Sequence, residues 1–157
     1  MIIYLGADHR GFKLKKILKT YLKENGYKVV DFGNDHYDES DDYPDFILPV
    51  AKKVAENPEQ NRGIVLGGSG QGEAMIANRI KGVRAAVYYG PSAFAKASAG
   101  KEEIIKLSRE HNDANILSLG ASFLEEEQAR QAVKIWLEIP FSKEERHIRR
   151  IKKIDSL

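Results

Sequence analysis

The sequence predicts an α/β fold built on a parallel sheet of five strands, and three observations lead to that prediction. Short apolar runs alternate along the chain with segments whose apolar residues recur at helical spacing. The runs are continuous, which is typical of strands buried on both faces of a parallel sheet. One run, Ile64 to Leu66, leads into four glycines within six residues and then into a helical pattern. That turn is the candidate ligand site, because ligands of open α/β sheets bind beyond the carboxyl ends of the strands.

The composition limits the classes of protein to consider. A chain of 157 residues, 42% of them hydrophobic, fits one domain covering residues 1–157. The formal charge of +2 gives no reason to expect a nucleic-acid partner, and no apolar run approaches the ~20 residues of a membrane span. There is no cysteine for a disulfide or a metal site, and no charged-then-apolar leader. We therefore expect a cytoplasmic protein without a membrane partner.

The predicted elements follow one another along the chain. Strands are expected at residues 2–7, 29–32, 64–66, 83–88 and 114–119. Helices are expected at residues 14–22, 43–56, 74–80 and 101–110, around 129–137, and at 142–155. Asn25-Gly26, Asn57-Pro58 and Ile139-Pro140 are typical helix ends, and Pro49 is expected to bend the second helix.

Two segments between these elements are predicted to be loops. Residues 33–42 hold His36 and four aspartates, but their spacing does not match a metal-binding loop, so we expect a solvated loop and no metal. Residues 90–100, G-P-S-A-F-A-K-A-S-A-G, are rich in small residues and lack periodicity. We interpret them as a mobile insertion.

The terminal helix is predicted to carry a cationic face. Ser142 with Glu145 resembles a capping box that opens this helix. At about 100° per residue, four cations form one stripe while Ile148 and Ile151 lie opposite. The four cations are Arg146, Arg149, Arg150 and Lys153. Such a stripe either is simply solvated or binds an anion.

The glycine turn contains two side chains with obvious chemistry, Ser69 and Glu73. The turn does not fit G-x-G-x-x-G and lacks the G-K-[ST] of a P-loop, so a dinucleotide or a nucleoside triphosphate is not expected. A carboxylate beside backbone N–H donors suits removal of a proton next to a carbonyl, because the carbon acid needs a base and the developing enediolate needs donors. The arginines suit a phosphate group.

Each candidate also has a purely structural interpretation. Glu73 could merely complement a helix dipole, and Ser69 could merely stabilise the turn. Roles in loops, helix ends or the core are open to the other candidates, Asp8, His9, Tyr43 and His111. Their joint position at the ends of predicted strands favours the functional interpretation.

Five motifs occur in order along the chain: G-A-D-H-R-G-F, D-Y-P-D-F, G-G-S-G-Q-G-E with I-A-N-R, S-R-E-H-N-D-A-N, and R-H-I-R-R. Together they resemble the type B ribose-5-phosphate isomerases and their galactose-6-phosphate isomerase relatives. The resemblance covers nearly the whole chain, and only residues 90–100 look like an added segment.

The resemblance implies a three-layer α/β/α fold with a Rossmann-like, five-stranded parallel sheet. It also implies a homodimer or tetramer with sites where two subunits meet, a phosphorylated sugar as partner, and no metal or cofactor. The implied reaction interconverts ribose 5-phosphate and ribulose 5-phosphate through a cis-enediol, in the pentose phosphate pathway.

The resemblance also assigns roles to residues. The family's base is either a cysteine two positions before the Ser/Thr of the glycine loop or a glutamate four positions after it; these places hold Gly67 and Glu73, so Glu73 is implied as the base. Ser69 and the loop N–H groups would hold the enediolate oxygen. The other implied roles are ring opening by His111, help at the oxyanion from Asn112, sugar contacts from Asp8 and Tyr43, phosphate contacts from His9, Arg146 and Arg150, and a loop shaped by Gly67, Gly68, Gly70 and Gly72.

One position departs from the family pattern. Relatives usually carry an arginine after the fifth strand, in a G-x-R context, that helps to bind phosphate, whereas Gly120-Ala121-Ser122 places a serine there. One interpretation is that Ser122 caps the following helix with Glu125. The other is that a phosphate contact is missing, in which case Arg149 or Lys153 replaces it, the phosphate is held more weakly, or the substrate differs. We take weaker phosphate binding as the hypothesis.

Two other functions remain open at this point. A hexose-phosphate isomerase acting on allose or galactose 6-phosphate would use the same motifs, and the sequence does not determine the length of the sugar pocket. A non-catalytic sugar-phosphate-binding module would keep the arginines and histidines but would not need a base. The presence of Glu73 argues against the module.

Overall fold

The structure is a computed structural model that describes residues 1–90 and 103–157. The insertion expected at residues 90–100 falls, apart from Gly90, outside the described residues. The strands are β1 (Ile2–Ala7), β2 (Lys28–Asp31), β3 (Arg62–Gly67), β4 (Ala85–Tyr88) and β5 (Ile116–Gly120). The helices are α1 (Phe12–Glu24), α2 (Tyr43–Ala55), α3 (Gln71–Ala77), α4 (Glu103–Glu110), α5 (Glu126–Glu138) and α6 (Glu145–Asp155).

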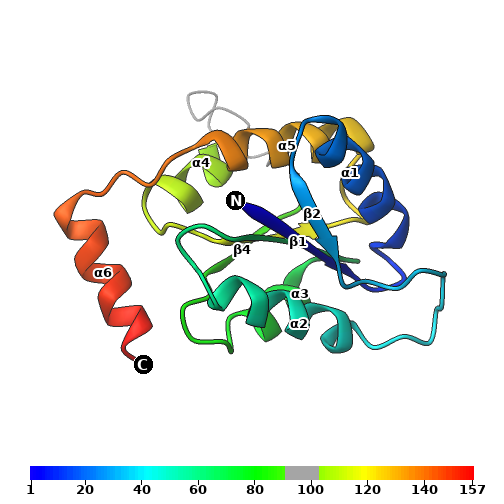
Figure 1. The fold of residues 1–157 in the computed structure, drawn as a ribbon, viewed down its shortest axis with the longest axis horizontal. Coiled ribbons are helices and arrows are strands. Elements are labelled where there is room, and N and C mark those ends of the chain that lie inside the picture. Colours follow the sequence, from blue (N-terminus) through cyan, green and yellow to red (C-terminus); the bar gives the residue numbers. More distant parts are fainter. Residues whose placement is uncertain (91–102) are drawn as a thin grey trace.

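The five strands form one parallel sheet in the order β2-β1-β3-β5-β4, so β3 lies at its centre. Helices α1, α4 and α5 cover one face and α2 and α3 cover the other, which gives three layers (Figure 1). The predicted α/β fold with a five-stranded parallel sheet is confirmed. The chain leaves β1 toward one sheet edge and β3 toward the other, so the crevice between their carboxyl ends is the expected ligand position.

The continuous apolar runs are explained by the two cores on either side of the sheet. In β3, Ile64 and Leu66 pack into the core beneath α1, α4 and α5, while Val65 packs into the core beneath α2 and α3. All three side chains are fully buried. A central parallel strand therefore has no polar face, and the alternation typical of a half-exposed strand is absent.

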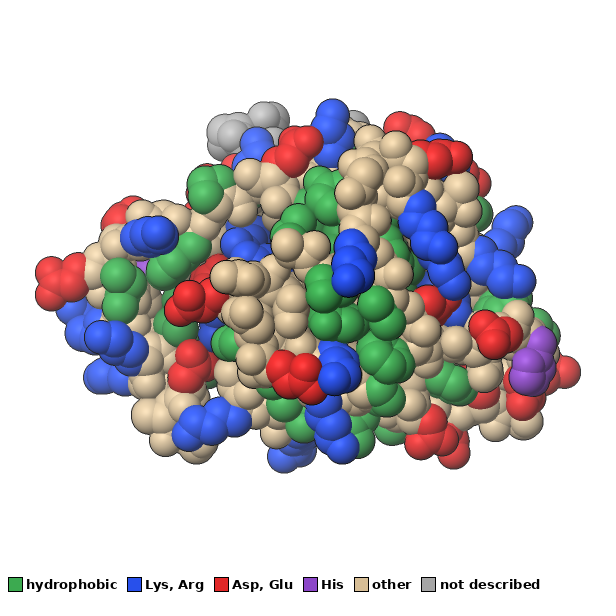
Figure 2. Space-filling view, in the orientation of Figure 1, with side chains coloured by type: hydrophobic (Ala, Val, Ile, Leu, Met, Phe, Trp, Pro, Cys, Tyr) green, Lys and Arg blue, Asp and Glu red, His purple; other side chains and the backbone are tan. Residues whose placement is uncertain are grey.

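Helix α6 lies apart from the three layers, at the end of the molecule where the strands begin (Figure 1). Lys and Arg side chains gather over this end of the surface in Figure 2. The predicted faces of the helix are confirmed, because Arg146, Arg149 and Arg150 are exposed whereas Ile148 and Ile151 are half-buried. No helix among the described residues is long and apolar enough to span a membrane.

The predicted cap at Ser142 is wrong, and the interpretation of Ser122 as a helix cap is also not supported. Helix α6 begins at Glu145 rather than at 142, because the Ser142 hydroxyl lies 2.7 Å from His147 Nδ1 and no side chain caps the helix. Helix α5 is opened by a capping box between Glu125 and Gln128, not by Ser122. Short hydroxyl side chains bond to whichever polar group is nearest in the fold, so cap patterns read from the sequence compete with tertiary partners.

A buried ion pair ties α1 to the edge strand β2. Lys15 Nζ lies 3.0 Å from Asp31 and also donates to the Asn34 carbonyl, although the Lys15 side chain is only 1% exposed. Lys19 and the Gly33 N–H donate to the same Asp31 carboxylate. Burial by itself raises the pKa of Asp31, but these hydrogen bonds outweigh burial, so the pKa lies below its ordinary value.

We predict that Asp31→Asn lowers the free energy of unfolding by roughly 3 to 5 kcal/mol, because it leaves the buried Lys15 ammonium without its counter-charge. Since the pKa of Asp31 is depressed in the folded state, its contribution is present above the unfolded-state pKa and is lost as the pH falls through the folded-state value. Urea unfolding at fixed protein concentration measures the loss. The control is Glu56→Gln, which breaks an exposed pair with Lys53 and should cost less than about 1 kcal/mol. Equal losses in both variants would contradict this account.

Candidate active site

The turn after β3 holds Glu73 against the backbone of Gly67. Glu73 lies in the first turn of α3 and is only 4% exposed. A Cβ atom placed on Gly67 would lie 1.8 Å from Glu73 Oε1, so the carboxylate occupies the space that any side chain at position 67 would need. A side chain at position 67 would therefore require the Glu73 carboxylate to move.

The other glycines of the turn are needed for close approach and for backbone conformation. Gly70 has a φ of 76°, a region that side chains rarely adopt, and its carbonyl accepts a 2.6 Å hydrogen bond from the buried Ser118 hydroxyl. A Cβ on Gly72 would lie 2.9 Å from the Tyr43 ring. Tyr43, at the start of α2, is 37% exposed, so it borders the turn rather than filling the core.

Ser69 lies at the outer tip of this turn. Its side chain is exposed, and its hydroxyl accepts a 3.3 Å hydrogen bond from the Gln71 N–H. This bond gives Ser69 a role in the turn itself. Ser69 precedes Glu73 by four residues, and the backbone N–H groups of the glycine turn lie between the two in the sequence.

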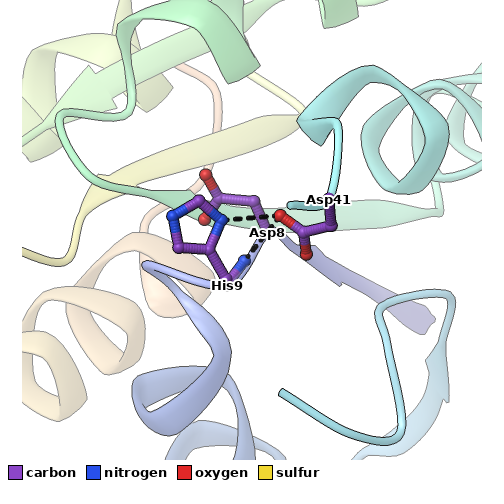
Figure 3. Close-up of side chains that lie close together, drawn as sticks. All are labelled: Asp8, His9 and Asp41. Atoms are coloured by element: carbon purple, nitrogen blue, oxygen red, sulfur yellow. Dashed lines mark hydrogen bonds and ion pairs between the residues drawn. The ribbon is translucent and has the colours of Figure 1, made fainter. Parts of the chain in front are cut away.

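The loop after β1 adds Asp8 and His9, and residues 33–42 add Asp41 (Figure 3). His9 Nδ1 lies 2.7 Å from Asp41 Oδ1, which also accepts the His9 backbone N–H at 3.1 Å. The Asp41 side chain is 4% exposed and receives a further hydrogen bond from Asn34. The ligand atoms of Asp8, His9 and Asp41 all lie within 4.8 Å of one another, but hydrogen bonding alone accounts for the His9–Asp41 arrangement.

Burial is the main influence on the acid–base behaviour of Glu73. Removal from water raises the pKa of the Glu73 carboxyl above its ordinary value, the backbone hydrogen bond lowers it, and the charge of neighbouring Asp8 raises it further. A carboxylate with a raised pKa is a stronger base. Glu73 is the described group that combines burial, such a shift and a position beside backbone donors.

The predicted residues His111 and Asn112 lie at the opposite ends of the strands, near the start of β5. They follow α4 and precede β5, whereas Glu73 follows β3, and β5 alone spans roughly 16 Å at about 3.3 Å per residue. The backbone that carries them is fixed by Arg84, which donates to the Asn112 carbonyl and pairs with Asp113 at 3.0 Å. One chain therefore does not bring all the predicted site residues together.

The C-terminal helix joins this second group. The rings of His111 and His147 lie 4.3 Å apart between centroids, and burial together with His111 lowers the pKa of His147. Arg146 pairs with Glu144 at 2.8 Å, and Arg150 is exposed. The structure thus divides the predicted site into a strand-end group and an α6 group. The strand-end group comprises Asp8, His9, Tyr43, Gly67, Gly68, Ser69, Gly70, Gly72 and Glu73, and the α6 group comprises His111, Asn112, Arg146 and Arg150.

Three residues that lie beside these groups were not predicted as site residues: Asp41, His147 and Arg10. Asp41 stood among four aspartates of an acidic loop, and only the fold selects the one that reaches His9, 32 residues away. His147 and Arg10 lie inside quoted motifs, R-H-I-R-R and G-A-D-H-R-G-F. Their presence in those motifs was the signal that could have identified them.

A cavity of about 690 Å³ lies between α6 and the body of the molecule. It is lined by Arg62, Arg84 and Arg109, among others, and by none of the predicted site residues. Burial and the neighbouring Arg109 lower the pKa of Arg62 to about 10. Arg84 and Arg109 both pair with Asp113, so two of the arginines that line this cavity are engaged in ion pairs.

The fold and the strand-end group define an α/β protein with a buried carboxylate at the carboxyl ends of a parallel sheet. The Ribose/Galactose Isomerase family model matches residues 3–154, and the chain belongs to this family. Ribose-5-phosphate isomerase B of Mycolicibacterium paratuberculosis is 38% identical over 151 residues, 96% of this chain and 87% of that protein.

Solved structures give the same result. The structure of ribose-5-phosphate isomerase B from Mycoplasma genitalium with bound ribulose 5-phosphate superposes with a TM-score of 0.89 at 37% identity, covering 99% of this chain and 94% of that one. Ribose-5-phosphate isomerase B from Clostridium thermocellum gives a TM-score of 0.86 at 42% identity, covering 99% and 96%.

We predict that Gly67→Ala displaces the Glu73 carboxylate and returns its pKa toward the ordinary value of 4.5, because burial is the first cause of the shift. The variant would then lose the Glu73 proton at a lower pH than the parent does. A ¹³C NMR titration of the glutamate side chains measures this.

Gly68→Ala is the matched control, since a Cβ there meets its neighbours at 3.6 to 3.8 Å, which is ordinary contact. It should leave the Glu73 titration unchanged. A folded Gly67→Ala protein that titrates like the parent would show that the carboxylate is not held over Gly67.

Proposed function

We infer that this protein is an aldose–ketose isomerase that interconverts ribose 5-phosphate and ribulose 5-phosphate through a cis-enediol. The observation that carries this inference is the Glu73 carboxylate, which is buried over Gly67 in the first turn of α3 and has a raised pKa. A relative with the same fold binds ribulose 5-phosphate. We assign the reaction to the pentose phosphate pathway and the protein to the cytoplasm.

In the mechanism we propose, Glu73 removes the proton from C2 of the open-chain aldose. The electron pair of the C–H bond forms the C1–C2 double bond while the carbonyl pair moves onto O1, which gives the enediolate. A proton then passes from O2 to O1, and Glu73 returns its own proton to C1 as the carbonyl forms at C2, which gives the ketose. Ser69 and the N–H groups of the glycine turn hold the developing negative oxygen. This proton transfer uses a carboxylate and hydrogen-bond donors, and we propose no metal or cofactor for it.

The remaining residues are proposed to bind and open the sugar. Asp8 and Tyr43 contact the sugar hydroxyls from the strand-end group, and His9 contacts the phosphate. His111 moves the ring proton of the furanose, and Asn112 assists at the oxyanion. Arg146 and Arg150 bind phosphate from α6, where both guanidinium groups are exposed.

These residues are divided between the carboxyl ends and the amino ends of the strands. This division supports a homodimer, or a tetramer of such dimers. In a two-fold dimer, the strand-end group of one subunit faces the α6 group of its partner, and each contact occurs twice. The composite site needs no movement of either group within its own chain. We therefore propose that each active site contains residues from both subunits.

The activity is tested by assaying purified protein on ribose 5-phosphate, allose 6-phosphate and galactose 6-phosphate in the presence of EDTA. We expect turnover of ribose 5-phosphate with the highest kcat/KM. A clear preference for a hexose phosphate would favour the hexose-phosphate isomerase, and no turnover of any sugar would favour a binding module.

We predict that Glu73→Gln lowers kcat for ribose 5-phosphate by on the order of 10² to 10⁴ while KM changes less than about threefold, because the amide keeps the shape but cannot accept the proton. Initial-rate kinetics measure both constants. Glu56→Gln, on the surface, is the control and should retain full activity. Turnover within about threefold of the parent would exclude Glu73 as the base.

The composite site predicts complementation between inactive variants. Mixing Glu73→Gln and His111→Ala subunits should restore roughly a quarter of the parental activity, because half of the dimers are mixed and each mixed dimer has one intact site. Refolding the mixture and assaying it measures the recovery.

The control mixture pairs Glu73→Gln with Ser69→Ala. Both residues belong to the strand-end group of one subunit, so no mixed dimer has an intact site and activity should not recover. Recovery in the control, or its absence in the first mixture when mixed dimers are demonstrated, would contradict a site shared in this way.

A further inference from the structure

Arg10, in the turn between β1 and α1, is a free cation beside the strand-end group. Its side chain is exposed and forms no ion pair or hydrogen bond with any residue in 1–90 or 103–157. Other arginines of the fold are committed: Arg84 and Arg109 pair with Asp113, and Arg146 pairs with Glu144. The Arg10 guanidinium is therefore available to a ligand.

The stem of Arg10 and the side chain of Ser122 both lie against Gly68 of the glycine turn. A Cβ placed on Gly68 would lie 3.6 Å from Arg10 Cγ and 3.6 Å from the Ser122 hydroxyl oxygen. The Ser122 N–H also donates to the Gly68 carbonyl at 3.0 Å. Arg10 and Ser122 thus flank the same glycine, one from the loop after β1 and the other from the loop after β5.

The negative charge at the carboxyl ends of the strands favours the binding of a cation there. Asp8, Asp41 and Glu73 place three carboxyl groups here, and Asp41 is engaged with His9 (Figure 3). A phosphorylated ligand adds further negative charge. In the turns after β1, β3 and β5, residues 8–11, 68–70 and 121–125, Arg10 is the single lysine or arginine. Its planar guanidinium can donate two parallel hydrogen bonds to a phosphate.

Two other candidates for the missing G-x-R arginine are Arg149 and Lys153. Both lie on α6, beyond the amino ends of the strands, so in the proposed dimer they would reach this position only from the partner subunit. The Arg10 side chain lies against Gly68, as the Ser122 side chain does, and Arg10 belongs to the same subunit as His9 and Glu73. We propose that Arg10 binds the substrate's phosphate in place of that arginine; this rests on the proposed function in taking a sugar phosphate as the ligand.

The first test is Arg10→Ala. KM for ribose 5-phosphate should rise about tenfold or more with kcat within about twofold, because a contact made equally to substrate and transition state changes KM alone. Lys13→Ala, which removes the same charge one helical turn further on at an exposed position, is the control and should leave KM unchanged. Equal effects of the two variants would indicate a long-range field rather than a contact and would overturn the proposal.

Rescue across Gly68 is the second test. In the Arg10→Ala background, Ser122→Arg should return KM to within about threefold of the parent, because the side chain at position 122 also lies against Gly68. In the parent, where Arg10 already supplies the charge, the same substitution should lower KM less. Failure of the folded double variant to recover any affinity would show that residues 10 and 122 do not serve one phosphate position.

Inorganic phosphate separates this proposal from the proposed activity. As a competitive inhibitor of the parent, it should have a Ki that rises in Arg10→Ala in parallel with KM, and an unchanged Ki alongside a raised KM would overturn the phosphate assignment. If the parent does not isomerise ribose 5-phosphate, the proposed function fails. Calorimetric titration of phosphate into the parent and into Arg10→Ala still tests Arg10, and equal affinities would exclude it.

Discussion

The site depends on one steric constraint, the absence of a side chain at Gly67. The Glu73 carboxylate fills the space in which a Cβ at position 67 would stand, and this is what removes the carboxylate from water while keeping it beside the glycine turn. Burial then raises the pKa of Glu73. A side chain at position 67 would need the volume that the Glu73 carboxylate occupies.

The parallel sheet imposes the second constraint. Residues just after a strand lie at the carboxyl ends of the strands, whereas residues just before a strand lie at the amino ends, on the other side of the sheet's length. Glu73 comes after β3, whereas His111 precedes β5 and stacks on His147 of α6. Each group is rigid by itself: Arg84 fixes the backbone beside His111, and Ser118 fixes the glycine turn. In the proposed dimer, association of two preorganised surfaces completes the site, and no loop within one chain has to close.

Electrostatics at the strand ends result from the same packing. Three carboxyl groups converge there, and each is accommodated differently: Asp8 accepts the Gly11 N–H, Asp41 holds His9, and Glu73 is desolvated. A ring nitrogen of His9 that is tied to Asp41 leaves the second nitrogen for a ligand (Figure 3). The carboxyl ends of the strands are thus acidic inside and carry the exposed Arg10 at the rim, an arrangement suited to a ligand with one anionic end.

The sequence by itself determined the fold class, the five strands and the turn that carries Ser69 and Glu73, because burial on two faces and the freedom of glycine leave local patterns. Element ends were less certain: α3 begins three residues earlier than predicted, at Gln71 rather than 74, and Ser142 bonds to His147 instead of capping α6. Only the tertiary structure decided the strand order, the contact of Glu73 with Gly67, the pairing of His9 with Asp41, and the distance between the two groups of site residues. Local sequence encodes which residues are buried and where the chain turns, whereas contacts between segments far apart in the chain depend on how the layers pack.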